Sequence, residues 1–399
     1  ADPAVLPSPA HGGGVGGGGL RRPGRLKRWQ WVLLVVASLV LLAITHPVRV
    51  AILALAVLPS AVPSLPFDPL VSLTPKPTRE YFTFPYPGGS VEGDVYSPGR
   101  GGRHGAIILL LGARPVDRDE PPLVRFAEGM SRAGLVVMVP ISSGLAAGRI
   151  QAHEVDALVG EVELLRARSD VDATRIGIIG LSVGGSVAIQ AAADPRLDGK
   201  LAFVNAFGSY FDTRDFARAI STRSLMYAGI DEAWEPDPLV LQVMARQMVD
   251  TLPDPHDRDV LDRLYIQSDP SARAEVSKMT PAGRAALGLL DGLPPAETEA
   301  ALAQLPPETL ARLDAISPSH VIDRVKTRLF LMHDHGDHVV PYIETRRMAA
   351  AAPPSIVERY AEFDLFDHVM PNRAPTNAEL YLELLRLLRQ LYGLLLYVL

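Results

Sequence analysis

Hydrophobic and polar positions change period many times after residue 80, and each change predicts a new secondary-structure element. Short apolar or alternating runs, which are typical of strands, alternate with segments in which apolar residues recur at helical spacing. The pattern predicts strands at 79–86, 90–98, 104–113, 135–141, 174–180, 200–210, 328–334 and 356–363, and helices at 121–134, 152–169, 183–194, 342–352 and the Leu-rich C-terminus. Because such alternation produces a mostly parallel sheet, we expect an α/β protein with helices on both faces of a central sheet.

This alternation is interrupted over 212–317, where the sequence is helix-like and broken by Pro-containing stretches such as EPDP and LPDPHDRD. An insertion of this length between two strands indicates a helical cap. The predicted α/β domain therefore has a first part at 80–211, the cap at 212–317 and a second part at 318–399.

The N-terminal part of the chain has a different character. The Gly-rich and then basic segment 1–28 is expected to be flexible. The uncharged run from Trp31 to Thr45 would span roughly 23 Å as a helix, which is shorter than a hydrocarbon core of about 30 Å. Because a second apolar run at 50–58 lengthens it, a transmembrane anchor is expected over 29–58. A cleaved signal peptide is the alternative. The Pro-rich segment 59–79 is expected to form a semi-rigid stalk. Under either interpretation the basic cluster stays in the cytoplasm and the α/β domain lies outside it.

Charge and composition exclude several classes of protein. The formal net charge is -6 and no basic stripe follows the N-terminal cluster, which argues against nucleic acid as a partner. The chain has no cysteine, so it has neither disulfides nor a thiolate metal site nor a cysteine nucleophile.

The stretch RIGIIGLSVGGSVAIQ contains the motif G-x-S-x-G with Ser182 at its centre. The motif follows a predicted buried strand and opens a small-residue helix, which is the context that a nucleophile elbow requires. In such an elbow the tight turn exposes the serine hydroxyl above the sheet. Ser182 is therefore the candidate nucleophile, and a plain glycine-rich turn between strand and helix is the alternative.

The stretch MHDHGDHVVP concentrates three histidines and two aspartates. Four of its residues match H-x-H-x-D-H, the spacing that begins the dinuclear zinc site of metallo-β-lactamase-like hydrolases: His333, His335, Asp337 and His338. Such a site needs several further ligands downstream, whereas residues 339–399 contain a single histidine, His368. We favour the other interpretation, a turn that carries the acid of a serine hydrolase without a metal.

From about residue 80 to the C-terminus the chain resembles the α/β-hydrolase superfamily, especially its dienelactone-hydrolase-like and prolyl-oligopeptidase-like serine hydrolases. In that superfamily the serine follows the fifth strand, the acid follows the seventh and the histidine follows the eighth. RLFLMHDHGDHVVP resembles the seventh-strand ending, in which an aspartate lies a few residues before Val-Pro, and this assigns the acid to Asp337. IVERYAEFDLFDHVMP resembles the eighth-strand ending, which assigns the base to His368. The chain order Ser182, Asp337, His368 agrees with the order in this fold.

The resemblance implies an α/β-hydrolase fold with the cap inserted after strand six, and a reaction through an acyl-enzyme without a cofactor. Neighbouring carboxylates leave alternatives for the acid: Asp212, after strand six, is the second candidate, while Asp334 and Asp367 fit the motif less well.

The resemblance also implies an oxyanion hole made of backbone amides. The amide after the nucleophile belongs to Val183. The second amide maps by position onto Ala113, with Arg114 as a near alternative, because the loop after strand three has the sequence LLGARP where the family usually has His-Gly.

The cap is expected to determine the substrate, because it lies over the nucleophile. Side chains near its start are candidates for an acyl pocket or, alternatively, for the packing core between cap and sheet: Phe207, Tyr210, Phe211, Met226, Tyr227 and Trp234. Little in the cap suggests selection for charge, so a moderately apolar ester is the expected substrate.

These features together predict a membrane-anchored, extracytoplasmic serine esterase or lipase-like hydrolase. An acyltransferase or a peptidase with the same triad, and a catalytically silent binding module, remain alternatives. The apolar segment LLLYVL after Gly393 predicts a membrane contact beside the anchor, a subunit contact or simple burial.

Overall fold

The computed structural model describes residues 27, 29, 31, 45–62, 65, 67–370 and 377–399. The chain divides into two units, Ala1–Arg49 and Val50–Leu399, and the second contains the sheet, the cap and every candidate site residue. The predicted anchor run from Trp31 to Thr45 lies outside the described residues except for its two ends. None of the helices in the described part of the chain has the length and apolar character that crossing a bilayer requires.

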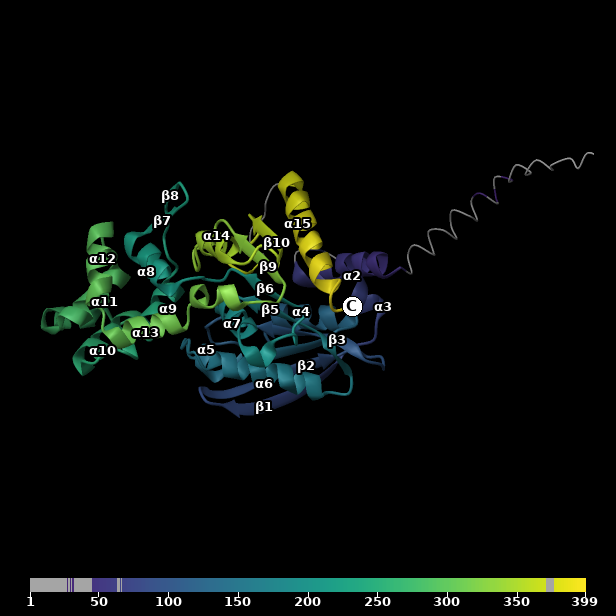
Figure 1. Ribbon diagram of the computed structural model, residues 1–399, viewed down its shortest axis with the longest axis horizontal. Coiled ribbons are helices and arrows are strands. Elements are labelled where there is room, and N and C mark those ends of the chain that lie inside the picture. The colour runs from purple at the N-terminus through teal and green to yellow at the C-terminus, as the bar shows by residue number, and fades with distance from the viewer. Residues whose placement is uncertain are drawn as a thin grey trace, which may run out of the picture. The chain divides into compact units, whose positions relative to one another are not determined.

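Eight strands form the central sheet in the order β1-β2-β4-β3-β5-β6-β9-β10. β2 pairs antiparallel with β1 and β4, and the other neighbouring pairs of this sheet are parallel. The strands are β1 (Thr78–Tyr86), β2 (Gly89–Ser97), β3 (His104–Leu110), β4 (Val136–Ser142), β5 (Val171–Leu181), β6 (Phe203–Phe207), β9 (Leu329–Asp334) and β10 (Val357–Phe363). This strand order is that of the α/β-hydrolase fold, so the predicted fold class is confirmed (Figure 1).

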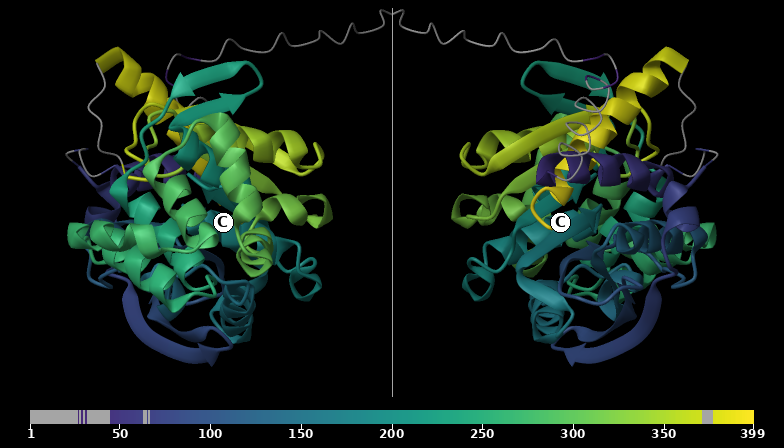
Figure 2. Two further views of the ribbon diagram at one scale, coloured as in Figure 1. Left: turned by 90° about the vertical axis from the view of Figure 1, so that its left-hand side faces the viewer. Right: turned by 90° about the vertical axis from the view of Figure 1, so that its right-hand side faces the viewer.

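Helices cover both faces of the sheet (Figures 1 and 2). One face packs against α6 (Glu154–Ala167), α7 (Val183–Ala192) and α14 (Tyr342–Ala351), and the other against α2 (His46–Ala61), α4 (Pro121–Arg132) and α15 (Asn377–Leu395). Within β3, Ile108 belongs to the first hydrophobic cluster, while Ile107 and Leu109 belong to the second. Because side chains alternate along a strand, a continuous apolar run supplies both cores at once.

The cap is mixed rather than purely helical. It contains six α-helices, α8 (Thr213–Thr222), α9 (Pro238–Val249), α10 (Pro255–Leu261), α11 (Pro281–Asp291), α12 (Pro295–Gln304) and α13 (Pro307–Ala315). It also contains an antiparallel hairpin of β7 (Ser224–Tyr227) and β8 (Ile230–Ala233), which corrects the expectation of helices alone. The prolines that interrupt the sequence pattern stand at the first position of five of these helices, where the missing N–H group has no intrahelical partner to lose.

The segment before the sheet packs on the domain and does not form a stalk. The second apolar run lies in α2, whose residues Val50, Ala54 and Leu58 are buried in the same cluster as α4 and α15. Asp68, the N-cap of the short helix α3 (Pro69–Leu73), accepts a hydrogen bond of 2.9 Å from Ser60 Oγ. The expectations of an anchor that extends to residue 58 and of a stalk over 59–79 are therefore corrected for the residues that the structure describes.

The C-terminal segment is also part of the core. Leu394, Leu395 and Val398 are buried in the cluster beneath α2 and α4. Of the three alternatives for LLLYVL, burial is the one that the structure shows. The first turns of α15 differ, because Tyr381, Leu382 and Leu385 are exposed there.

Two leucines of α2 test this packing with the same substitution. Leu58 is 6% exposed and Leu55 is 59% exposed. Leu58→Ala is expected to lower the free energy of unfolding by about 2–5 kcal/mol, since it removes buried methyl groups and leaves a cavity. Leu55→Ala, the matched control, is expected to change it by less than about 0.5 kcal/mol. Chemical denaturation of the full chain measures both, and equal effects would contradict the packing of α2 on the domain.

Candidate active site

Ser182 occupies a strained turn between β5 and α7. Its backbone has φ 55° and ψ −129°, in a region that side-chain-bearing residues rarely adopt. The Ser182 amide donates to the carbonyl of Phe207 at 2.7 Å, which ties the turn to β6. A Cβ atom on Gly184 would lie 2.4 Å from the carbonyl oxygen of Leu110, so only glycine allows α7 to approach β3 this closely. The geometry is that of a nucleophile elbow.

The loops after β9 and β10 bring Asp337 and His368 into contact. His368 Nδ1 lies 2.6 Å from Asp337 Oδ2. His368 has φ 57° and sits in a tight turn, closed by two backbone hydrogen bonds between Asp367 and Met370. Its ring packs against the backbone of Gly208, where an added Cβ would lie 3.1 Å away. The ends of β9 and β10, where the sequence predicts the acid and the base, thus place both side chains at one edge of the sheet.

Asp337 is a buried carboxylate with four donors around it. Oδ1 accepts from the amides of Val339 and Val340 at 2.7 and 2.8 Å. Oδ2 accepts from His368 and also lies 3.2 Å from His333 Nε2. Burial alone would raise the pKa of Asp337, but the charge of His368 and the hydrogen bonds from His333 and His368 outweigh it and hold the pKa well below its usual range. The carboxyl is therefore ionised at neutral pH.

Ser182 and His368 line the same cavity. Among the described residues no hydrogen bond joins their side chains. In enzymes without substrate, such contacts are often long and tighten only when the substrate binds.

The candidate oxyanion amides surround Ser182. Val183 is the first residue of α7, and the N–H groups of a helix's first turn have no intrahelical acceptor. An added Cβ on Gly112 would lie 3.0 Å from Ser182 Cβ, so the loop after β3 passes directly beside Ser182. The Arg114 amide donates to the Gly112 carbonyl at 3.1 Å, which favours Ala113 over Arg114 for the second amide.

The other polar residues of the histidine-rich stretch have separate contacts. The three histidine rings do not converge: His333 is buried against Thr345 Oγ1, His335 bonds Glu362 and Asp364, and His338 Nδ1 lies 2.9 Å from the carbonyl of Glu235. Asp334 accepts from the amides of Gly336 and Phe366 and holds the two loops together. These contacts assign His335 and His338 to the loop surface and Asp334 to loop structure.

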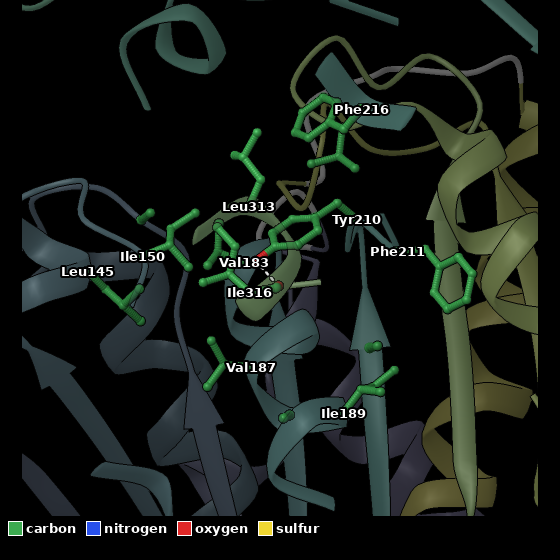
Figure 3. Close-up of a cluster of buried hydrophobic side chains, with 14 of the residues drawn as sticks. Leu145, Ile150, Val183, Val187, Ile189, Tyr210, Phe211, Phe216, Leu313 and Ile316 are labelled. Atoms are coloured by element: carbon green, nitrogen blue, oxygen red, sulfur yellow. Dashed lines mark hydrogen bonds between the residues drawn. The ribbon is translucent and has the colours of Figure 1, made fainter. Parts of the chain in front are cut away.

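The predicted pocket residues divide into two groups. Phe207 and Tyr210 line the cavity that contains Ser182, and the Tyr210 hydroxyl donates to the carbonyl of Ile316 at 3.0 Å (Figure 3). Met226 is 48% exposed on the β7–β8 hairpin, outside the cavity. Trp234 is buried behind Phe216 of the lining, with ring centroids 6.4 Å apart, and donates from Nε1 to the carbonyl of Asp337 at 2.8 Å. Neither Met226 nor Trp234 is part of the lining of this cavity, and Trp234 connects the cap to the loop that carries Asp337.

Sequence reasoning missed most of the lining. The cavity has a volume of about 240 Å³ and its surface is largely apolar. On one side it is lined by α9, and on the other by α4, α15 and the end of α2. The sequence identified these segments as helices, but which of their residues face the cavity depends on how distant segments pack.

Asp212, the alternative acid, lies elsewhere in the hydrogen-bond network. Its Oδ1 accepts from the amides of Arg214 and Asp215 and so caps α8, and its Oδ2 accepts from Ser319 Oγ. Beside it, buried Glu344 accepts from the amides of Phe211 and Asp212 at 2.9 and 3.0 Å. Burial raises the pKa of Glu344 to about 7, and these two amides offset only part of the rise.

Glu344 predicts a pH dependence of stability. Its pKa rises from 4.5 to about 7 on folding, so between these values the folded protein binds more protons than the unfolded chain. The free energy of unfolding therefore decreases as pH rises through this window, by on the order of 3 kcal/mol from this group. In Glu344→Gln the decrease should be smaller by that amount. Denaturant unfolding of both proteins at pH 5 and pH 8 measures it, and equal pH dependence in the two would refute the buried, proton-binding carboxyl.

Comparison with known proteins adds similarities of structure. No family model matches the chain, and no curated protein matches its sequence. Among solved structures, 2,6-dihydroxy-pseudo-oxynicotine hydrolase has a TM-score of 0.48 at 17% identity, over 80% of this chain and 68% of that chain. Puromycin hydrolase has a TM-score of 0.47 at 14% identity, over 83% and 40%. The acylaminoacyl peptidase of Pyrococcus horikoshii has a TM-score of 0.46 at 15% identity, over 79% and 41%, so this chain spans about two fifths of that peptidase.

Proposed function

We propose that the protein is a serine hydrolase that cleaves carboxylic ester bonds through an acyl-enzyme intermediate. The observation that carries the proposal is the 2.6 Å contact between His368 and the buried Asp337, on the same cavity as the strained Ser182 turn. An ionised acid, an imidazole and a serine at an elbow make up the relay that activates a hydroxyl nucleophile.

Each group has one role in the proposed reaction. Ser182 Oγ attacks the carbonyl carbon while His368 Nε2 takes its proton and then gives that proton to the leaving alcohol. Asp337 keeps the proton on Nδ1 of His368 and stabilises the imidazolium. The amides of Val183 and Ala113 stabilise the oxyanion, each such donor being worth about 10²–10³ in rate. Water, activated by His368, then hydrolyses the acyl-enzyme.

The lining of the cavity favours an apolar ester as the substrate. Arg114 and Glu120 are charged residues of the lining, and they pair with each other at 2.9 Å. The remaining described lining is mostly aliphatic and aromatic, which suits an uncharged acyl or alkyl chain.

We also propose, from the sequence alone, that the run from Trp31 to Thr45 attaches the protein to a membrane. The run has no charge and follows five basic residues within 21–28. The helix that follows the run, α2, packs on the domain through its buried residues from Val50 onward.

A fluorophosphonate tests the nucleophile. The wild-type chain is expected to form a stoichiometric adduct, located by peptide mass spectrometry at Ser182, and to hydrolyse p-nitrophenyl esters faster than the matching anilides. Ser182→Ala should form no adduct. A folded wild-type protein without an adduct would contradict the proposal, and preferred cleavage of the anilide would replace the esterase by a peptidase.

The two candidate acids provide a matched pair of variants. Asp337→Asn should slow both labelling and ester hydrolysis by several orders of magnitude, because it leaves His368 without its anionic acceptor. Asp212→Asn should retain labelling, since asparagine also caps helices well. The opposite ranking would assign the acid to Asp212.

Membrane attachment has its own test. The full chain is expected to sediment with membranes, and detergent but not high salt should release it. A variant that lacks residues 1–45 should remain in the supernatant while keeping the fluorophosphonate adduct. Sedimentation of both proteins would place the attachment elsewhere in the chain.

A further inference from the structure

One part of the cavity at Ser182, called the arm below, is lined by residues on the face of the sheet that α4 and α15 cover, whereas the cap residues belong to the hydrophobic cluster of the other face. This arm lies between the sheet and the helices α4 and α15, and the end of α2 contributes Ser60 and Ala61 to its wall. α2 and α15 are far apart in the sequence but lie on the same face of the sheet (Figures 1 and 2). The arm therefore has one wall of strands and one wall of helices.

The strand wall contains a polar residue in an apolar row. Strand register places Leu109 of β3 beside Ile179 of β5, Ile179 beside Asn205 of β6, and Asn205 beside Phe330 of β9. Leu109, Ile179 and Asn205 all line the cavity. Ile179 precedes Ser182 by three residues, so at about 3.3 Å per residue this row lies roughly 10 Å below the nucleophile. Asn205 thus marks the deep part of the arm.

The helix wall contains a second carboxamide. Gln390 of α15 lines the cavity and is completely buried. Its neighbours along the helix, Leu387, Leu391 and Leu394, are also buried and line the same cavity. Neither Oε1 nor Nε2 of Gln390 has a hydrogen-bond partner among the described residues, and the same holds for Oδ1 of Asn205, which is 2% exposed. Buried amide groups nearly always have partners, so two on facing walls of one cavity indicate a group that they bind.

The surroundings define the chemistry of that group. Carboxamides offer both donors and acceptors and carry no charge. Arg114 and Glu120 pair with each other, and Asp337 is satisfied by its own four donors. An ion in this arm would have to be buried without a countercharge, which is strongly unfavourable. The arm therefore suits an uncharged group with both donor and acceptor capacity, on an apolar chain.

We infer that the arm is a specificity subsite, in which Asn205 and Gln390 bind a hydroxyl or amide group carried by an apolar chain of the substrate, roughly 10 Å from the scissile carbonyl. The inference rests on the proposed ester hydrolysis at Ser182. It narrows the substrate class from apolar esters to esters whose chain has an uncharged polar group near its end. An ester without that group leaves both amides unpaired in the complex, and the site discriminates against it.

Two pairs of esters test the subsite. The first pair is p-nitrophenyl octanoate and its ω-hydroxy derivative, and the second is octyl acetate and its ω-hydroxy derivative. In at least one pair, kcat/KM of the wild type is expected to be roughly ten- to hundredfold higher for the hydroxylated ester. Gln390→Leu and Asn205→Leu, from opposite walls, should each reduce that ratio to near one.

The ratio within a pair is the readout, so a general change in the rate of a variant cancels. Gln304→Leu, the same substitution at an exposed position of α12, should keep the wild-type ratio. The absence of a preference in both pairs, as expected if the amides bind only water, or a preference that survives in both variants, would overturn the inference. Fluorophosphonate labelling of the wild type separates this result from a failure of the proposed function, because a protein that does not label overturns both.

Discussion

A carboxylate that is buried and yet ionised is the constraint around which this site is arranged. Asp337 has no exposed side-chain surface, and such a charge persists in a protein interior only when donors surround it. The amides of Val339 and Val340 fix the turn after β9, and His333 and His368 complete the shell. If one donor were lost, the charge would be left partly uncompensated. The turn after β9 is therefore folded so that its amides satisfy this one side chain.

Residues of the cap also hold the loop that carries Asp337. Trp234 donates to the backbone carbonyl of Asp337, and the amide of Asp237 donates to the carbonyl of His338 at 2.8 Å. The loop after β9 is thus held from the cap as well as from the sheet. Glu344 holds the point where the chain enters the cap, because its carboxyl group accepts hydrogen bonds from the amides of Phe211 and Asp212. The cap is thus connected through backbone groups to the loop that carries Asp337, one of the triad candidates.

The fold was largely predictable because its signals are local. A strand buried on both faces is mostly apolar, so the apolar runs of β3 and β9 were visible in the sequence. The glycines around Ser182 are required by a backbone approach that any Cβ would block. The contact between Asp337 and His368 was predicted from motifs at two strand ends, and the structure places it there. The hairpin in the cap was missed because its strands have only four residues each, too few to show a clear strand pattern.

What could not be predicted depends on partners distant in the sequence. The run Val50–Leu58 is equally apolar whether lipid or protein covers it, and only the packing of α2 beside α4 and α15 distinguishes the two. Met226 and Trp234 are close in sequence, yet the hairpin turns one to solvent and buries the other. No motif in the sequence singled out Asn205 or Gln390, which lie in segments predicted as a strand and a helix.

Asn205 and Gln390 line a cavity whose wall also includes segments from both ends of the described domain, the end of α2 and α15. An apolar cavity between a sheet and its helices is normally filled by side chains, because close packing stabilises the core. Here α15 and the end of α2 cover one face of the sheet, and part of the space between them and the sheet belongs to the cavity that contains Ser182. A polar group in that space gains hydrogen bonds that no described side chain supplies to Gln390, while an apolar group of equal size leaves its amide desolvated and unpaired. Discrimination by such a site comes from the penalty imposed on the wrong chain, so it can be strong even where the attraction for the right one is modest.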